Sequence, residues 1–204
     1  RYPVPGWRRS TPSWVAGRCC IWVTAFKAVI SQGFMDSIVR IDHARADLFE
    51  GATCVITPRN GQHEQSIQRV EQFWRSLGSK IERRTPAEHD DEVAWVSHLP
   101  HLLAFAFADS LSAAPDRVGR LAGGGFRDFT RIAQSDAELW GEILSLNGKA
   151  LSGPLNQFSG SLAKLARVLE EGDGESLEKM LNQARLRLAE VGASASIRPD
   201  EDEV

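Results

Sequence analysis

The chain has 204 residues, 42% of them hydrophobic and 25% charged, and its 24 basic and 27 acidic side chains give a formal net charge of -3. This is ordinary globular composition that can enclose one substantial core, and three cysteines without a C-x-x-C pair exclude a disulfide scaffold. Neither a membrane span nor general nucleic-acid binding is favoured, because no apolar run reaches the roughly 18 residues of a span and the chain is acidic.

The first 41 residues differ in composition from the rest. They hold six basic residues, one acidic residue and three of the six tryptophans, which leaves 18 basic and 26 acidic residues for 42–204. No helical or strand period is sustained there, so we predict no element. Three interpretations stay open: a foreign or out-of-frame segment, a targeting peptide built on the apolar run Cys19–Phe26, and a basic arm for nucleic acid. We favour the first, because that run is short and no A-x-A cleavage site follows it.

Beyond this segment the pattern predicts a β-α-β arrangement. Residues 52–57 form a β-branched run that ends at Pro58, residues 66–77 predict a helix ended by Gly78, and residues 80–84 predict a second strand. The apolar stripe expected on the helix is Ile67, Val70, Phe73, Trp74 and Leu77. This unit is too small to be a domain by itself.

A long helix is predicted to begin at Thr85–Glu88, which combines an N-cap hydroxyl, a proline at the first helical position and an acid three residues after the cap. The helix is expected to reach Leu111 and to kink at Pro100, which cannot donate to the carbonyl of Val96. Ser135–Glu138 repeats the capping-box pattern and predicts another helix.

Apolar residues at alternating spacings of three and four predict an antiparallel helical hairpin, with one arm over Leu151–Leu169 and the other over Leu177–Val191. Gly153-Pro154 weakens the start of the first arm, and Gly172–Gly174 forms the turn. Two such helices cannot enclose their own apolar faces, so we expect them to pack on the kinked helix and on a second subunit. Residues 193–204 form an acidic tail that is expected to fray.

Three glycines, Gly123-Gly124-Gly125, precede a predicted helical start that carries Asp128 and Arg131. Bare backbone N–H groups at the positive end of a helix, with a guanidinium one turn later, suit an anion such as a carboxylate. A flexible turn followed by an ordinary surface pair of Asp128 with Arg131 explains the same pattern. A dinucleotide fingerprint is excluded here, because the third glycine is missing and no strand precedes the motif.

His98 and His101 stand at i and i+3 on one side of the helix that contains Pro100. No H-E-x-x-H pattern and no third ligand accompany them, so we expect no metal site. A histidine here could reach a substrate oxygen, or could simply be a core residue or cap the carbonyl that Pro100 frees. Trp140 is by default a core aromatic residue.

Several longer runs are familiar: LFEGATCVITP (48–58), PAEHD (86–90), SHLPHLLAFAFADSL (97–111), GGGFRDFTRIAQSDAELW (123–140) and the helical hairpin. Together, over about residues 43–192, they resemble prephenate dehydrogenase, including its cyclohexadienyl and arogenate variants. The resemblance implies an enzyme of tyrosine biosynthesis that oxidatively decarboxylates prephenate to 4-hydroxyphenylpyruvate with NAD or NADP. It also implies a homodimer, and with the sparse cysteines we expect a cytoplasmic protein.

The fold class implied by the resemblance is mainly α, a helical dimerisation domain preceded by a small α/β remnant of a nucleotide-binding, Rossmann-like domain. Residues 42–85 would then be the end of the nucleotide-binding domain and residues 86–192 the helical substrate-binding and dimerisation domain. Residues 1–41 stay an anomalous segment without an assigned fold, and residues 193–204 the frayed tail.

The resemblance also implies site residues. By position, Arg131 matches the family's substrate-carboxylate arginine, His101 the active-site histidine of the kinked helix, and Trp140 a pocket aromatic. Asp128 and the backbone of Gly125 match the loop that borders the pocket, in part from the partner subunit. Prephenate is a dicarboxylate, which a guanidinium beside N–H donors is suited to hold.

The sequence also departs from the family, since it contains no G-x-G-x-x-G and no histidine followed by proline, whereas the family carries its catalytic histidine in a His-Pro motif. We therefore expect an incomplete chain that is inactive alone, and we assign no catalytic or cofactor-binding residue. Prephenate and arogenate both stay open as substrates, as do NAD and NADP. The alternative is a non-catalytic helical dimerisation or regulatory module.

Overall fold

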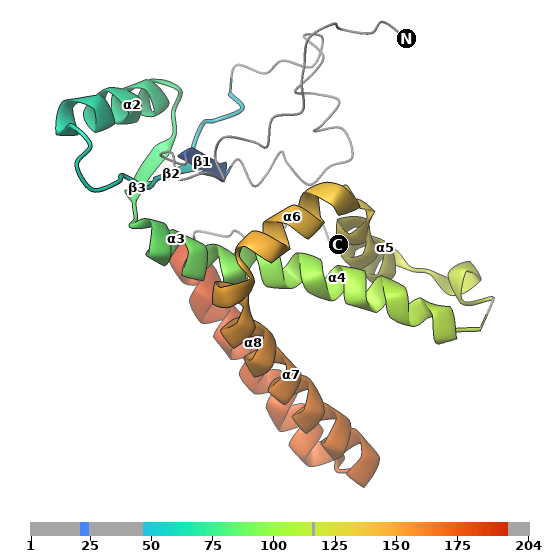
Figure 1. The fold of residues 1–204 in the computed structure, drawn as a ribbon. Coiled ribbons are helices and arrows are strands. Elements are labelled where there is room, and N and C mark those ends of the chain that lie inside the picture. Colours follow the sequence, from blue (N-terminus) through green and yellow to red (C-terminus); the bar gives the residue numbers. More distant parts are fainter. Residues whose placement is uncertain (1–20, 25–46, 116, 196–204) are drawn as a thin grey trace, which may run out of the picture. The chain divides into compact units, whose positions relative to one another are not determined.

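The structure, a computed structural model, describes residues 21–24, 47–115 and 117–195, and the chain divides into two compact units, Arg1–Ser152 and Gly153–Val204. The strands are β1 (Ile21–Thr24), β2 (Thr53–Ile56) and β3 (Lys80–Arg83) (Figure 1). The α-helices are α2 (Glu64–Ser76), α3 (Pro86–Val93), α4 (Leu99–Ser110), α5 (Gly124–Arg131), α6 (Ala137–Leu146), α7 (Gly148–Glu171) and α8 (Gly174–Ala195). One π turn, η2 (Ala94–His98), and three short 3₁₀ turns, η3 (Leu111–Ala113), η4 (Val118–Leu121) and η5 (Ile132–Gln134), connect them. The mainly α class with a small α/β unit is confirmed.

The predicted β-α-β arrangement is present. Strands β2 and β3 pair in parallel with Thr53 opposite Lys80, and α2 connects them. Strand β1 adds to the other side of β2 in antiparallel register, within the segment for which the sequence predicted no element. The buried core of this unit consists of Cys54, Ile56 and Ile67.

The apolar stripe predicted for α2 is partly wrong. Val70 and Trp74 pack on the core beside Ile67, but Phe73 is 57% exposed, whereas Glu71 is only 5% exposed. Glu71 and Phe73 lie on opposite edges of the stripe. The buried face of α2 therefore includes the edge with Glu71 and leaves out the edge with Phe73. The reason is a basic partner on the neighbouring strand.

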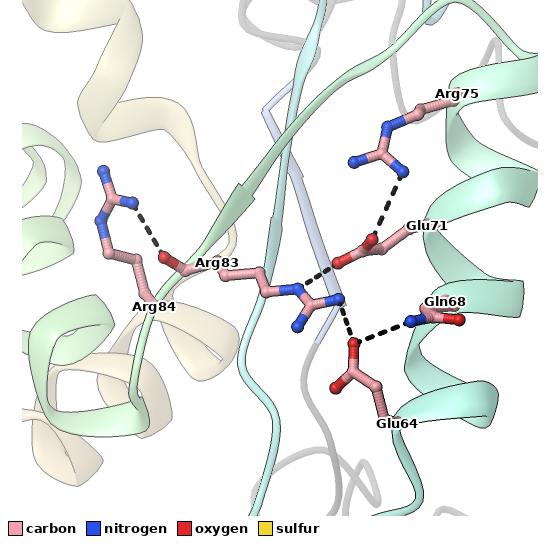
Figure 2. A network of polar contacts seen from close by, with 6 residues as sticks. All are labelled: Glu64, Gln68, Glu71, Arg75, Arg83 and Arg84. Atoms are coloured by element: carbon pink, nitrogen blue, oxygen red, sulfur yellow. Dashed lines mark hydrogen bonds and ion pairs between the residues drawn. The ribbon is translucent and has the colours of Figure 1, made fainter.

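That partner is Arg83, at the end of β3. Its guanidinium extends toward α2 and bonds two carboxylates there, Glu71 through Nε and Glu64 through Nη2 at 2.7 Å (Figure 2). Arg75, one turn after Glu71 on the same helix, bonds the second Glu71 oxygen at 3.3 Å. The charge network therefore joins strand to helix where an apolar contact was expected.

Gly78 ends α2 as predicted. Its φ of +87° is in the left-handed region, and a Cβ there would lie 3.0 Å from the Glu50 backbone, so both conformation and space favour glycine. The Ser79 N–H then donates to the Trp74 carbonyl at 3.1 Å. This closure returns the chain directly into β3.

The capping box at Thr85 is confirmed. The Thr85 hydroxyl accepts from the Glu88 N–H at 3.2 Å, and the Glu88 carboxylate accepts from the Thr85 N–H at 2.7 Å. The second predicted capping box is wrong in its position, because Asp136 and not Ser135 caps α6, accepting from the Leu139 N–H at 3.0 Å. Ser135 instead donates to the Ile132 carbonyl at 2.8 Å, so its hydroxyl is already used.

The helical hairpin is also present, with α7 and α8 side by side (Figure 1). Gly172 has a φ of +68° in the connection, and Asp173 accepts from the Ser176 N–H at 3.0 Å at the start of α8. Pro154 lies inside α7, which begins at Gly148, so the proline does not delay the helix start. None of the described helices is long and apolar enough to cross a membrane.

Candidate functional site

The segment before Pro100 does not continue as a regular α-helix. It forms the π turn η2, in which the Leu99 N–H donates to the carbonyl of Ala94, five residues back. Pro100 has no N–H to donate, and this weakens the ladder at the same place. The widened turn buries Ser97 and His98, the latter to 4% exposure. Such turns are frequent at functional sites.

His101, in the first turn of α4, is held between a backbone group and an aromatic ring. Its Nδ1 lies 2.9 Å from the Ser97 carbonyl, and its ring stacks on Trp140 with a centroid distance of 3.5 Å and an interplanar angle of 13°. The sequence suggested that a histidine here could cap the Val96 carbonyl, which Pro100 was expected to free. His101 does bond a backbone carbonyl, but it is the carbonyl of Ser97.

His98 completes this cluster. Its ring meets Trp140 edge to face, with centroids 6.3 Å apart at 80°, and its Nδ1 lies 2.9 Å from the side-chain nitrogen of Asn147. We call His98, His101 and Trp140 the aromatic site. Trp140 is therefore half-buried and contacts two imidazoles. It is not surrounded by apolar side chains alone, as a core aromatic residue would be.

Burial is the largest influence on both imidazoles. It lowers the pKa of His98, with smaller contributions from His89 and His101 in the same direction and from Asp90 against them. Burial likewise lowers the pKa of His101, against the Ser97 hydrogen bond, which raises it. Both side chains are therefore mainly neutral at pH 7, and the aromatic site carries no fixed positive charge.

Arg131 lies at the C-terminal end of α5, and both α5 and the η5 turn that follows it contact α4. Its side chain is half-buried, and among the described residues it forms no ion pair and no side-chain hydrogen bond. In particular, no ion pair joins Arg131 to Asp128, so the surface pair considered from the sequence is not formed in the described part of the chain.

Gly125 and Asp128 lie in the first and second turns of α5 and are exposed. Helix α5 begins at Gly124 with Gly123 as N-cap, so Gly124 and Gly125 lie inside the helix, whereas the sequence predicted that they precede it. No hydrogen bond or ring contact within the described residues joins Asp128 or Arg131 to the aromatic site. The structure thus brings His101 and Trp140 together directly and places Arg131 on a segment packed against the same helix.

Two residues of this region received no specific role from the sequence. His98 was named only as half of a pair, and Asn147, at the end of α6, was not singled out. Asn147 and His98 are 49 residues apart, so no local periodicity connects them. Only the packing of α6 against the π turn reveals their contact.

The described residues contain no group of three or more histidine, cysteine or acidic side chains that could hold a metal ion. An open pocket of about 420 Å³ lies elsewhere, beside the end of β2 and the start of α2. It is lined by Ile56, Gly61, Gln62, His63, Ser66, Ile67 and Val70, and includes none of the predicted site residues.

Comparisons with known proteins converge on one group of enzymes. Residues 85–183 match the family described as prephenate dehydrogenase, dimerization domain. Over 162 residues the chain is 29% identical to a cyclohexadienyl dehydrogenase of Zymomonas mobilis, and over 145 residues it is 28% identical to a prephenate dehydrogenase of Bacillus subtilis. These matches cover 78% and 70% of this chain, but only 55% and 39% of those relatives.

Solved structures agree. A prephenate dehydrogenase from A. aeolicus, in complex with hydroxyphenyl propionate and NAD+, superposes with a TM-score of 0.67 at 30% identity, covering 74% of this chain and 54% of that one. An arogenate dehydrogenase from Synechocystis superposes with a TM-score of 0.65 at 29% identity, covering 74% and 56%. The chain therefore spans about half the length of each.

Proposed function

We propose that this chain, which matches the prephenate dehydrogenase dimerization domain over residues 85–183, forms the substrate-binding and dimerising part of such an enzyme. The reaction we propose is the oxidative decarboxylation of prephenate, or of arogenate, with NAD or NADP as hydride acceptor. With prephenate the product is 4-hydroxyphenylpyruvate, an intermediate of tyrosine biosynthesis. The similar proteins named above support this proposal, because they are a cyclohexadienyl, a prephenate and an arogenate dehydrogenase.

The observation that carries the proposal is the stack of His101, on α4, against Trp140. Helix α5 contacts α4 and ends in Arg131, which has no ion pair among the described residues. The flat stack offers an aromatic wall for a six-membered ring. Arg131, half-buried and without an ion pair among the described residues, offers a bidentate contact to a carboxylate. We propose Gly125 and Asp128 as the border of the same site, with part of it supplied by the partner subunit.

The neutral imidazoles leave Arg131 as the cation that would attract an anionic substrate. Because burial lowers the pKa of both His98 and His101, the attraction for an anionic substrate falls to Arg131. Asp128 is a carboxylate three residues away on the same helix, and its repulsion disfavours an anion that is displaced from the guanidinium. The residues of this chain thus bind and orient the substrate, and they exclude water from one face of its ring.

The described residues do not fit a dinucleotide. The connection from β2 to α2 contains one glycine, Gly61, and the printed sequence has no G-x-G-x-x-G in which backbone could approach a pyrophosphate. We therefore derive no hydride-transfer step from these residues. NAD or NADP enters the proposal through the family alone.

The hairpin supports a homodimer. Val168 on α7 is buried, yet several large apolar side chains of α7 and α8 are exposed. They are Leu162, Leu169, Leu181, Leu186, Leu188 and Val191. An apolar surface of this kind favours association with a second copy. We also retain a reducing cytoplasm in the proposal, because three cysteines without a C-x-x-C pair offer no disulfide framework.

Binding of hydroxyphenyl propionate to the 204-residue chain tests the substrate site, because this stable compound occupies the A. aeolicus relative. Isothermal titration calorimetry should show binding that Arg131→Ala weakens about 10- to 150-fold, as expected for loss of one charge-assisted contact. Arg127→Ala is the matched control, because it removes the same charge from an exposed position on the same helix. Equal affinities in the two variants would contradict the assignment of Arg131.

The second candidate function is a non-catalytic dimerisation or regulatory module, which the exposed leucines of the hairpin favour by themselves. The same titration separates the two proposals. A chain that self-associates but shows no binding of hydroxyphenyl propionate would support the module and contradict a substrate site.

A further inference from the structure

Asn147, at the end of α6, joins two segments that are distant in sequence. Its side-chain Nδ2 donates to the Asp90 carbonyl at 2.8 Å, on α3, and lies 2.9 Å from His98 Nδ1, on the π turn. Asp90 and His98 precede it by 57 and 49 residues. An amide held from two directions has a fixed orientation.

The Asp90 contact decides which way round the amide lies. A carbonyl oxygen can only accept, so the group that faces it is the NH₂ and not the amide oxygen. The second hydrogen of the same NH₂ is then available to His98 Nδ1, which must accept it. In the neutral imidazole the proton therefore lies on Nε2, an assignment that follows from the partners.

His101 has the opposite arrangement. The Ser97 carbonyl that faces its Nδ1 can only accept, so Nδ1 carries the proton and Nε2 keeps a lone pair. Two neighbouring neutral imidazoles thus hold their protons on opposite nitrogens. The Nε2 of His98 is a donor, and the Nε2 of His101 is an acceptor.

The two Nε2 atoms are the polar atoms of these rings that no contact uses among the described residues. Neither forms a hydrogen bond with another described residue, and neither is among the fully enclosed polar atoms of the described part of the chain. Both rings contact Trp140, one face to face and one edge to face. The donor and the acceptor therefore border the same indole.

We propose that Asn147 is a positioning residue that holds His98 as an Nε2–H donor beside the Nε2 acceptor of His101. The aromatic site then recognises a ligand that offers both an acceptor oxygen and a hydroxyl hydrogen. This inference rests on the proposed function, since carboxylates and a ring hydroxyl are the polar groups of the proposed substrate. Hydroxyphenyl propionate carries both types of group and serves as the probe.

The tautomers are read directly from the ring-nitrogen NMR spectrum of the ligand-free 204-residue chain, with His98→Gln and His101→Gln to assign the signals. At pH 8 both imidazoles are neutral, and we expect the proton on Nε2 in His98 and on Nδ1 in His101. In Asn147→Leu the His98 proton should redistribute over both nitrogens, while the His101 signals stay unchanged. A proton on Nδ1 of His98 in the wild-type chain would overturn the inference.

Affinity for hydroxyphenyl propionate measures the consequence. We expect Asn147→Leu to weaken binding about tenfold, as for one lost hydrogen bond to a charged group. Asn147→Asp should restore only part of the affinity: its carboxylate raises the pKa of His98 and the imidazolium keeps its Nε2–H, but the carboxylate has no proton to donate to the Asp90 carbonyl. Asn156→Leu, at an exposed position of α7, is the control.

A merely structural asparagine would give a different pattern. Asn147→Leu and Asn147→Asp would then lower the melting temperature and leave the affinity and the His98 signals unchanged, which would overturn the positioning role. Absence of binding by the wild-type chain would overturn the proposed function, and the ligand recognition inferred here with it. The spectra need no ligand and decide the tautomers separately.

Discussion

Replacing Glu71 by glutamine tests whether the charge network of Figure 2 stabilises the α/β unit. The carboxylate is almost completely buried on α2, yet it is bonded by Arg83 from β3 and by Arg75 from its own helix. Glutamine preserves the volume and one acceptor oxygen but turns the other oxygen into a donor. That donor would then face the Arg75 guanidinium, which has no acceptor to offer.

The magnitude follows from the exposure of the partners. A hydrogen bond to a charged group contributes about 1.5–3 kcal/mol, and the contact of Glu71 with Arg83 belongs near the lower end because the Arg83 side chain is 44% exposed. The contact with Arg75 contributes less, about 0–1 kcal/mol, because the Arg75 side chain is 56% exposed and the pair is screened by water. We therefore expect Glu71→Gln to destabilise the α/β unit by about 1.5–2.5 kcal/mol.

Hydrogen exchange of the α2 amides measures this loss locally, without requiring the whole chain to unfold in one step. Glu64→Gln is the matched control: it removes the same charge from the same guanidinium, but the Glu64 side chain is 54% exposed, so its effect should be clearly smaller. Equal effects of the two variants, or unchanged exchange in Glu71→Gln, would refute the idea that burial of the Glu71 carboxylate makes its ion pair with Arg83 stabilising.

The network also predicts an acid dependence with a defined sign. Hydrogen bonding by Arg83 is the largest cause that lowers the pKa of Glu71 below its ordinary value of 4.5. A group whose folded pKa is lowered stabilises fully above that ordinary value and loses its contribution as the pH falls through the folded pKa. Protection of α2 should therefore be constant from pH 7 to about 5, decline below that, and decline less in Glu71→Gln.

Four further outcomes are expected. Arg131→Lys should recover only part of the affinity for hydroxyphenyl propionate that Arg131→Ala loses, because lysine keeps the charge without the fork; full recovery in the titration would contradict bidentate binding. Leu188→Glu, at a side chain already 69% exposed, should shift sedimentation toward monomer while Asn182→Glu does not, and equal behaviour would place the interface elsewhere. The purified 204-residue chain should form no NADH or NADPH from prephenate, since no G-x-G-x-x-G is present, and measurable absorbance at the reduced-cofactor band would disprove this. Thr85→Ala should destabilise the start of α3 by about 1 kcal/mol, seen as faster amide exchange there and nowhere else.

Local chemistry explains why much of the fold could be predicted. The β-branched run over residues 52–57, the glycine at Gly78 and the capping box at Thr85 each specify their conformation within a few residues. The leucine spacing of the hairpin works in the same way over a longer distance. At each of these places, the residues that determine the backbone conformation lie close in the sequence to the backbone that adopts it.

The features that the sequence did not reveal depend on partners across space. Glu71 is buried because Arg83 approaches from a strand, and the edge of the α2 stripe is shifted as a result. The cap of α6 is a local exception: the Ser135 hydroxyl bonds the Ile132 carbonyl three residues earlier, and Asp136 caps the helix instead. The contact of His98 with Asn147 depends on how α6 packs on the π turn.

The roles of the candidate site residues stay predictions. Resemblance to the family selected His101 and Trp140, and the structure stacks these two rings on each other. For Gly125 and Asp128 the predicted role includes the partner subunit, and the contacts of one chain do not test it. Tautomers follow only from hydrogen-bond partners, and a sequence does not contain them.

The π turn at Ala94–His98 has a consequence for how this region tolerates change. A π turn is an α-helix with one residue inserted, and one residue corresponds to about 100° of rotation around the helix axis. The rotational phase of α3 is fixed by its capping box, and that of α4 by its contacts with α5 and η5. The π turn takes up the extra residue without rotating α4 relative to α3. Deleting one residue from Ala94–Ser97 would therefore close the turn to a regular α-helix and leave His101 on Trp140, whereas inserting one more residue would rotate the imidazoles by about 100° away from the indole.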